Sequence, residues 1–114
     1  MDLGIAGRTA IICASSRGLG RACAFALAEA GCHVVVNGRD AKSLQTTADE
    51  IRAKTGAKVM PAAGDVGTPA GQAALFAAAP EPDILINNNA GPPPRDLREL
   101  KHFHDLWRYP WFAR

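Results

Sequence analysis

The chain has 114 residues, of which 47% are hydrophobic and 21% are charged, and its formal net charge is +2. These values are ordinary for one globular domain, and the charge is too small to favour binding to nucleic acid or to a membrane surface. Three cysteines without metal-ligand spacing, no signal-peptide pattern and no long apolar run predict a reduced, cytoplasmic protein without a metal site.

Residues 9–20, TAIICASSRGLG, organise the rest of the chain. An apolar run predicts a strand over 8–14, and Gly18 and Gly20 then precede a helical pattern. A strand, a tight turn and a helix are typical of a phosphate-binding unit, because N–H groups and the dipole at a helix start favour negative charge. The alternative is an ordinary strand-to-helix turn, since Ala14 stands where the dinucleotide-binding motif has a first glycine.

Strands and helices are expected to alternate along the first part of the chain. Short apolar runs predict further strands over 33–37, 58–62 and 83–87, and helical patterns fall over 19–31, 40–56 and 68–79. This alternation predicts an α/β fold in which right-handed crossovers connect the strands of a parallel sheet.

Each helix carries a stripe at helical spacing that is expected to face the sheet. The stripes are Leu19, Cys23, Leu27 and Ala30 in the first helix, Leu44, Thr47, Ala48 and Ile51 in the second, and Leu75, Phe76 and Ala79 in the third. Asp40 and Thr68 precede the second and third helices and are expected to cap them.

The character of the sequence changes after Gly91. Three prolines follow, and five of the seven aromatic residues then fall within 103–112 without a clean periodicity. We divide the chain into a domain over 1–91 and a tail over 92–114. One interpretation makes the tail an aromatic anchor for a partner or a base-stacking strip. We favour a tail without a packing site, as a shifted reading frame would produce, because basic residues are too sparse for a nucleic-acid surface.

Four short motifs lie in order on this alternating frame: CASSRGLG at 13–20, NGRD at 37–40, GDV at 64–66 and NNAG at 88–91. Together they resemble the N-terminal half of a short-chain dehydrogenase/reductase and are most similar to the 3-oxoacyl-[acyl-carrier-protein] reductase branch. The resemblance implies a Rossmann-like parallel sheet of about four strands, in the order 3-2-1-4, with flanking helices. In the family motif T-G-x-x-x-G-x-G, Cys13 and Ala14 take the first two places.

The resemblance also implies a set of cofactor-binding residues at the carboxyl ends of the strands, where open α/β sheets bind ligands. The set comprises Ala14, Ser16, Arg17, Gly18, Leu19, Gly20, Asn37, Arg39, Asp65, Val66, Asn89, Ala90 and Gly91. The family places an acidic side chain, here Asp65, against the adenine, and a simple turn cap is the alternative role. The asparagine motif is either a cofactor border or a plain turn, and Asn87 leaves its register open by one residue.

The tip of the second strand favours NADP(H) over NAD(H). Cofactor-binding domains that prefer NAD usually place a carboxylate there for the ribose 2′-hydroxyl, whereas Asp40 is better used as a helix cap. Arg39 and Arg17 would instead converge on a 2′-phosphate. The alternative is that Arg39 is an ordinary solvated loop residue.

The family's catalytic residues have no counterpart in the sequence. Family members use a tyrosine as general acid/base, a lysine four residues later and a serine, whereas the only tyrosine, Tyr109, is followed four places on by Ala113. We therefore assign no catalytic residue and expect a truncated or frame-disrupted reductase, related to enzymes of fatty acid metabolism and inactive alone. Homo-oligomers are typical of the family, but their interface helices are missing here. The alternatives are a stand-alone nucleotide-binding or interaction module and a subunit whose catalytic half is another polypeptide.

Overall fold

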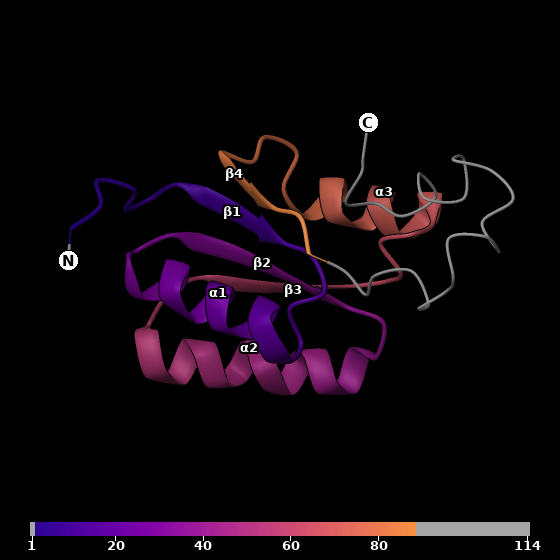
Figure 1. Cartoon of the computed structure of the whole chain (residues 1–114), viewed down its shortest axis with the longest axis horizontal. Coiled ribbons are helices and arrows are strands. Elements are labelled where there is room, and N and C mark those ends of the chain that lie inside the picture. Colours follow the sequence, from indigo (N-terminus) through magenta and orange to yellow (C-terminus); the bar gives the residue numbers. More distant parts are fainter. Residues whose placement is uncertain (1, 89–114) are drawn as a thin grey trace, which may run out of the picture.

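The computed structural model describes residues 2–88, so the predictions for Asn89, Ala90, Gly91 and the tail over 92–114 lie outside the described residues. Strands and helices alternate, and the four strands form one parallel sheet in the order β3-β2-β1-β4 (Figure 1). The α/β fold and the strand order are as predicted. The elements are β1 (Thr9–Ile12), α1 (Gly18–Glu29), β2 (His33–Gly38), α2 (Ala41–Thr55), β3 (Val59–Ala63), α3 (Pro69–Ala78) and β4 (Ile84–Ile86).

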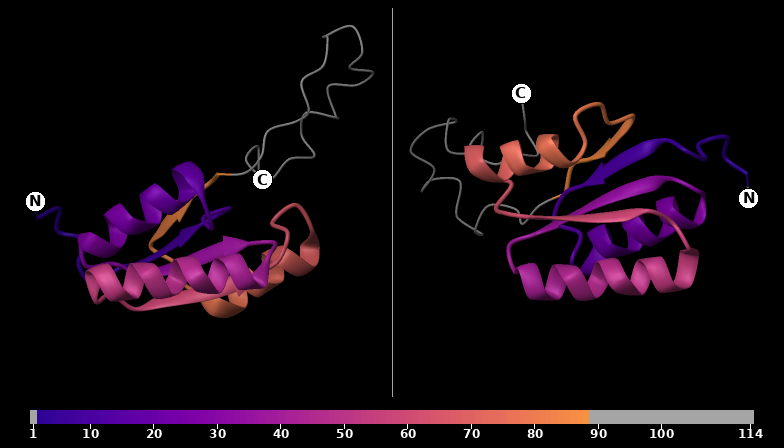
Figure 2. Two further views of the ribbon diagram at one scale, coloured as in Figure 1. Left: turned by 90° about the horizontal axis from the view of Figure 1, so that it is seen from below. Right: turned by 180° about the vertical axis from the view of Figure 1, so that it is seen from behind.

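The direction of the connections reverses at β1. The chain passes from β1 through β2 to β3 with α1 and α2 on one face, and α3 then crosses the other face to reach β4 (Figures 1 and 2). One row of paired residues runs across the whole sheet, through Leu85, Ile11, Val35 and Met60. In open α/β sheets, the carboxyl ends of the strands at such a switch point are where ligands bind.

Helices α1 and α2 pack on the sheet through small and branched side chains. The α2 stripe of Leu44, Thr47, Ala48 and Ile51 is buried as predicted. The predicted α1 stripe is wrong at Leu19, which is 73% exposed, whereas Cys23 and Leu27 are half-buried and pack against the core. The buried residues of α1 are Gly20, Ala24 and Ala28. Their small side chains let the helix lie close to β1 and β2, while Leu19 is left outside the core.

The opposite face of the sheet has a smaller core beneath α3. Leu75 and Ala79 pack there with Val66 and with Ile11, Cys13, Val35 and Ala62 of the sheet. The prediction for Phe76 is wrong, since 59% of the residue is exposed. The apolar run of the fourth strand suggests burial, but the strand is only partly buried. Leu85 is 54% exposed, because β4 lies at the edge of the sheet and α3 covers only part of this face.

The starts of the helices differ in how their N–H groups are satisfied. Asp40 accepts a hydrogen bond from the Lys42 N–H at 3.0 Å, and Thr68 accepts one from the Gly71 N–H at 3.1 Å, so both predicted caps are confirmed. Hydrogen bonds from the Ser43 hydroxyl and the Lys42 N–H hold the pKa of Asp40 below its usual value. In contrast, the residue before α1, Arg17, provides no side-chain cap. Within residues 2–88, no helix has the length and apolar character needed to cross a membrane.

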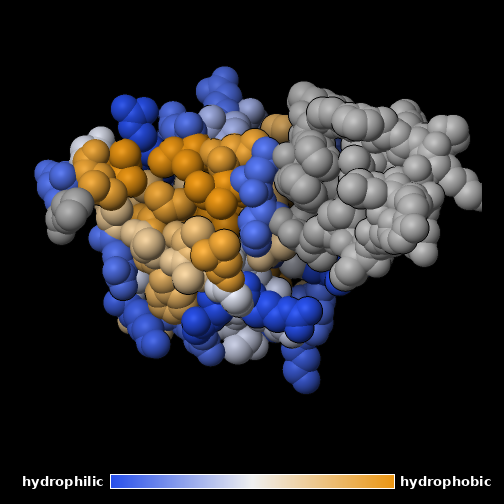
Figure 3. Space-filling model, viewed as in Figure 1, coloured by the Kyte–Doolittle hydropathy of each residue, from blue (hydrophilic) through white to orange (hydrophobic). Residues whose placement is uncertain are grey.

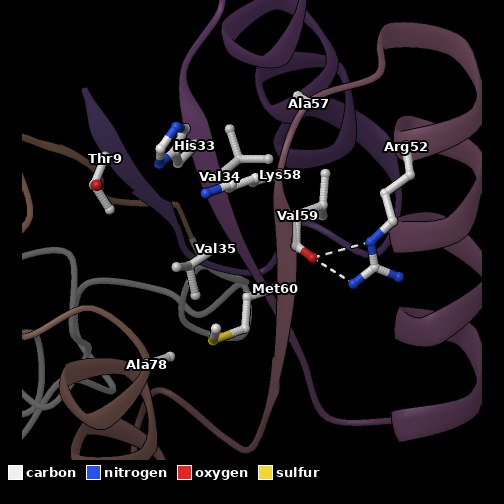
Figure 4. Close-up of a pocket in the computed structure, with 10 residues that line it drawn as sticks. All are labelled: Thr9, His33, Val34, Val35, Arg52, Ala57, Lys58, Val59, Met60 and Ala78. Atoms are coloured by element: carbon white, nitrogen blue, oxygen red, sulfur yellow. Dashed lines mark hydrogen bonds between the residues drawn. The ribbon is translucent and has the colours of Figure 1, made fainter. Parts of the chain in front are cut away.

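The two edges of the sheet are protected to different degrees. Along β3, the Arg52 side chain reaches over from α2 and donates two hydrogen bonds to the Val59 carbonyl (Figure 4). Pro61, on the same strand, has no N–H to donate. Both devices block the pairing of another strand with an edge. At the β4 edge, no equivalent side chain is found among the described residues. Apolar residues gather over the β1 and β4 side of the molecule (Figure 3).

Candidate functional site

The turn between β1 and α1 lies at the carboxyl end of the central strand. Ala14 has a φ of 48° and is the one non-glycine residue with a positive φ in the described part of the chain. Ser15 is buried, and its hydroxyl donates a hydrogen bond to the Ile12 carbonyl at 2.8 Å. The turn thus folds back on the strand that it follows, and Arg17, Gly18 and Leu19 are left exposed at its tip.

Asn37, at the end of β2, holds this turn to the neighbouring strands. Its side-chain oxygen accepts a hydrogen bond from the Ala14 N–H at 3.0 Å, and its amide donates to the carbonyls of Ala62 and Gly64, both at 3.1 Å. Its backbone N–H and carbonyl bond to Ser15. Asn37 is 2% exposed, so it is a buried residue whose hydrogen bonds connect the turn to the ends of β2 and β3. Contact with a cofactor stays a prediction.

Two further residues hold the turn, and neither was in the predicted binding set. The Thr47 hydroxyl of α2 donates to the Ser16 carbonyl at 2.7 Å, and the Asn88 amide donates to the Ala14 carbonyl at 3.2 Å. Thr47 was predicted only as a member of a buried stripe. The signal that could have found it is chemical, because a hydroxyl in an apolar stripe needs a partner.

Gly20 lets α1 approach the turn closely. A Cβ atom on this residue would lie 2.3 Å from the Ala14 carbonyl oxygen and 2.9 Å from the Asn88 amide nitrogen. No side chain fits there without moving backbone atoms. The second glycine of the predicted motif therefore has a packing role, independent of any ligand.

The exposed tip of the turn leaves open space beside the start of α1. Gly18 has a φ of 62°, and an added Cβ there would meet nothing within 4 Å, so the space above it is open. The first N–H groups of a helix have no partner within the helix, and α1 has no side-chain cap to satisfy them. A phosphate would accept hydrogen bonds from these groups and interact favourably with the helix dipole.

Asp65 and Val66 follow the carboxyl end of β3, so they lie at the same end of the sheet as the turn. The Asp65 carboxylate accepts a hydrogen bond from the Gly67 N–H at 2.8 Å, which is the turn-capping role that the sequence left open. The Val66 side chain is buried in the core beneath α3. Asp65 is exposed, and a contact with adenine stays a prediction.

Arg39 is exposed directly after β2, and Arg17 is exposed at the tip of the turn. Both therefore lie at the carboxyl end of the sheet, as predicted. Cys13 and Cys32 are buried, and burial raises the pKa of both thiols. Across residues 2–88, no group of three His, Cys, Asp or Glu side chains is placed to hold a metal ion.

A surface groove of about 540 Å³ lies at the other end of the sheet (Figure 4). Its lining includes Thr9, His33 and Lys58, which lie at or beside the starts of strands, together with Met60 and Ala78. The predicted binding residues lie at the ends of strands, so this groove is separate from the candidate site.

Replacing Ala14 with glycine is expected to stabilise the fold by about 0.5–1 kcal/mol. A left-handed conformation costs a non-glycine residue about 1–2 kcal/mol, and the greater freedom of glycine in the unfolded chain offsets about 0.4–1 kcal/mol of the gain. Urea denaturation of Ala14→Gly measures the difference. Ala63→Gly, in an exposed strand position, is the control and should lose stability. A loss in Ala14→Gly would contradict the expected strain.

Comparison with known proteins finds a family that the chain matches. A model of the family described as short chain dehydrogenase matches residues 8–108. An uncharacterized oxidoreductase, YvaG, from Bacillus subtilis is 44% identical over 89 residues, which are 77% of this chain and 34% of that protein. A rhamnolipids biosynthesis 3-oxoacyl-[acyl-carrier-protein] reductase from Pseudomonas aeruginosa is 38% identical over 88 residues, with 74% of this chain and 34% of that protein covered.

Solved structures agree with the observed topology. The crystal structure of L-sorbose reductase from Gluconobacter frateurii, complexed with NADPH and L-sorbose, superposes with a TM-score of 0.81 at 33% identity. The match covers 97% of this chain and 43% of that chain. The chain thus spans about a third of the length of the curated relatives and less than half of this structure.

Proposed function

The chain belongs to the short-chain dehydrogenase family, and from this premise we propose that it forms a binding unit for NADP(H). The observation that carries the proposal is the start of α1. It has no side-chain cap, unlike α2 and α3, and it lies beside open space at the switch point of the sheet. The diphosphate of the cofactor would satisfy its N–H groups.

We assign different roles in cofactor binding to the residues of the turn and its neighbours. Ser16, Arg17, Gly18 and Leu19 would provide the surface for the diphosphate, and Gly20 would hold the helix start against Ala14. Asn37 would hold the turn in its binding conformation through its hydrogen bond with Ala14. Asp65 and Val66 would lie toward the adenine, with Asn89, Ala90 and Gly91 beside the ribose.

Preference for the phosphorylated cofactor is part of the proposal. Asp40, the acid that follows the tip of β2 in the sequence, is engaged as the cap of α2 and is therefore poorly placed to accept a hydrogen bond from a ribose 2′-hydroxyl. Arg39 and Arg17 are exposed cations at the same end of the sheet, and arginine is well suited to phosphate. The complexes of L-sorbose reductase with NADPH and of a metagenomic short-chain oxidoreductase with NADP support this preference.

When bound, the cofactor supplies a hydride donor or acceptor for a carbonyl or alcohol. The residues of this chain would hold that cofactor, whereas no Y-x-x-x-K sequence is present to move the proton. We therefore propose that the 114-residue chain binds cofactor without turning over a substrate alone. The activity resembled most closely is reduction of 3-oxoacyl groups, supported by the relative from Pseudomonas aeruginosa.

Titration of the purified chain with NADPH and NADH, followed by nicotinamide fluorescence, tests the proposal. We expect tighter binding of NADPH by about tenfold or more, since one charge-assisted hydrogen bond contributes about 1.5–3 kcal/mol. Arg39→Asp should reduce or reverse this ratio, and Lys42→Ala, a change of exposed charge on α2, should preserve it.

Four outcomes would contradict parts of the proposal. Absence of binding by both cofactors would contradict the binding unit, and equal affinities or an unchanged ratio in Arg39→Asp would contradict the role of Arg39. Steady-state reduction of a 3-oxoacyl substrate by the parent chain would contradict the proposed inactivity.

A further inference from the structure

We propose that Thr47 of α2 is a positioning residue for the phosphate-binding turn. It fixes the peptide between Ser16 and Arg17 so that the Arg17 N–H faces away from α2. This inference rests on the proposed function and deepens it, because it assigns a role to a residue outside the predicted binding set.

The first observation is the contact itself. The Thr47 hydroxyl donates to the Ser16 carbonyl oxygen at 2.7 Å, and the two residues are 31 positions apart in the sequence. Thr47 is 4% exposed and lies in the stripe that α2 presents to the core. A threonine hydroxyl within a helix often bonds to a carbonyl of its own preceding turn, as Thr46 does with Lys42. Thr47 instead reaches another element.

The second observation is the geometry of the peptide. The described residues contain no cis peptide bond, and in a trans peptide the carbonyl and the following N–H point in opposite directions. Because the Ser16 carbonyl is directed to Thr47 on α2, the Arg17 N–H must point away from α2. Arg17 is in an extended conformation at the start of α1, and neither its side chain nor its backbone N–H has a hydrogen bond within residues 2–88.

The third observation is that the preceding residues of the turn are held from other directions. Asn37 fixes the Ala14 N–H, Ser15 bonds to β1 and β2, and Asn88 fixes the Ala14 carbonyl. Among the described residues, the hydrogen bond from Thr47 is the one that reaches the peptide between Ser16 and Arg17, directly before the open tip. Without it, that peptide could rotate while the rest of the turn stayed in place.

The test compares Thr47→Val, which removes the hydroxyl and keeps the shape, with Thr47→Ser, which keeps the hydroxyl. Thr46→Val is the matched control, since it makes the same change at an exposed neighbour on the same helix. We expect Thr47→Val to weaken NADPH binding by about tenfold, the equivalent of one lost orienting hydrogen bond. Thr47→Ser should restore most of the affinity, and Thr46→Val should leave it unchanged.

Nuclear magnetic resonance of the ligand-free chain supplies an independent measurement. The carbonyl carbon of Ser16 and the amide of Arg17 should shift in Thr47→Val and return toward the parent values in Thr47→Ser. Unchanged resonances in Thr47→Val would overturn the inference. So would lower stability with unchanged NADPH affinity, because a purely structural role predicts that combination. Failure of the parent chain to bind NADPH would contradict the proposed function instead, and the ligand-free resonances would then decide the role of Thr47.

Discussion

Replacing Gly71 with alanine is expected to lower the free energy of unfolding by about 3 kcal/mol or more, which is a large fraction of the stability of a small domain. Gly71 lies in the first turn of α3, and a Cβ atom there would be 1.9 Å from the Asp65 carbonyl oxygen and 2.5 Å from the Asp65 carbonyl carbon. Both neighbours are backbone atoms, so the new methyl group cannot be accommodated by a rotamer change. Either α3 or the segment after β3 must move.

A nearby glycine provides the control for this prediction. A Cβ on Gly67 would lie 3.2 Å from a side-chain oxygen of Asp65, which can rotate away. Urea denaturation monitored by circular dichroism should show a small change for Gly67→Ala and a large loss for Gly71→Ala. Equal stability of the two variants would mean that α3 is not packed as closely on the Asp65 backbone as the structure shows.

Replacing Gly20 with alanine is expected to reduce both stability and NADPH affinity. Alanine is the better helix former by about 1 kcal/mol, so intrinsic propensity alone predicts stabilisation. A Cβ on residue 20 would lie 2.3 Å from the Ala14 carbonyl oxygen, and this clash outweighs the gain in helix propensity. Neither atom can move without a shift of the backbone to which it is attached. We expect a net loss of about 2 kcal/mol and an affinity at least about tenfold lower, since α1 must move away from the turn.

Ala22→Gly separates the two contributions for Gly20→Ala. Ala22 is exposed on the same helix, so this change reports helix propensity without a steric contact. Denaturation gives the stability of each variant, and fluorescence titration gives its affinity for NADPH. A Gly20→Ala chain that is more stable than the parent, or that binds NADPH equally well, would contradict the close approach of α1 to Ala14.

The sequence was sufficient for the features that depend on local pattern. Asp40 and Thr68 were predicted as caps because short polar side chains before a helical run satisfy its first N–H groups. The α2 stripe was predicted because its apolar residues recur at a clear helical period. The parallel sheet followed from the alternation of strands and helices.

Features that depend on distant partners were not predictable in the same way. Leu19 has the hydrophobicity of a core residue, but the contact of Gly20 with Ala14 sets the rotation of α1 and leaves Leu19 outside. The hydrogen bond from Thr47 to Ser16 joins two elements that are separated in sequence. The hydrogen bond from Asn88 to Ala14 likewise joins residues far apart in the sequence, and the register of the asparagine motif stays a prediction.

Arg52 precedes Val59 in the chain, so a ribosome releases the blocking side chain before the strand whose carbonyl it covers. As soon as β3 pairs with β2, that outer edge is closed, and the growing sheet can accept a new strand only beside β1. There β4, the next strand to be synthesised, later pairs. Identical chains emerge close together on a polysome. Because the β3 edge is already blocked, a strand of a neighbouring chain has one sheet edge fewer with which to pair. We therefore expect the arginine to favour pairing within a chain over pairing between chains during translation.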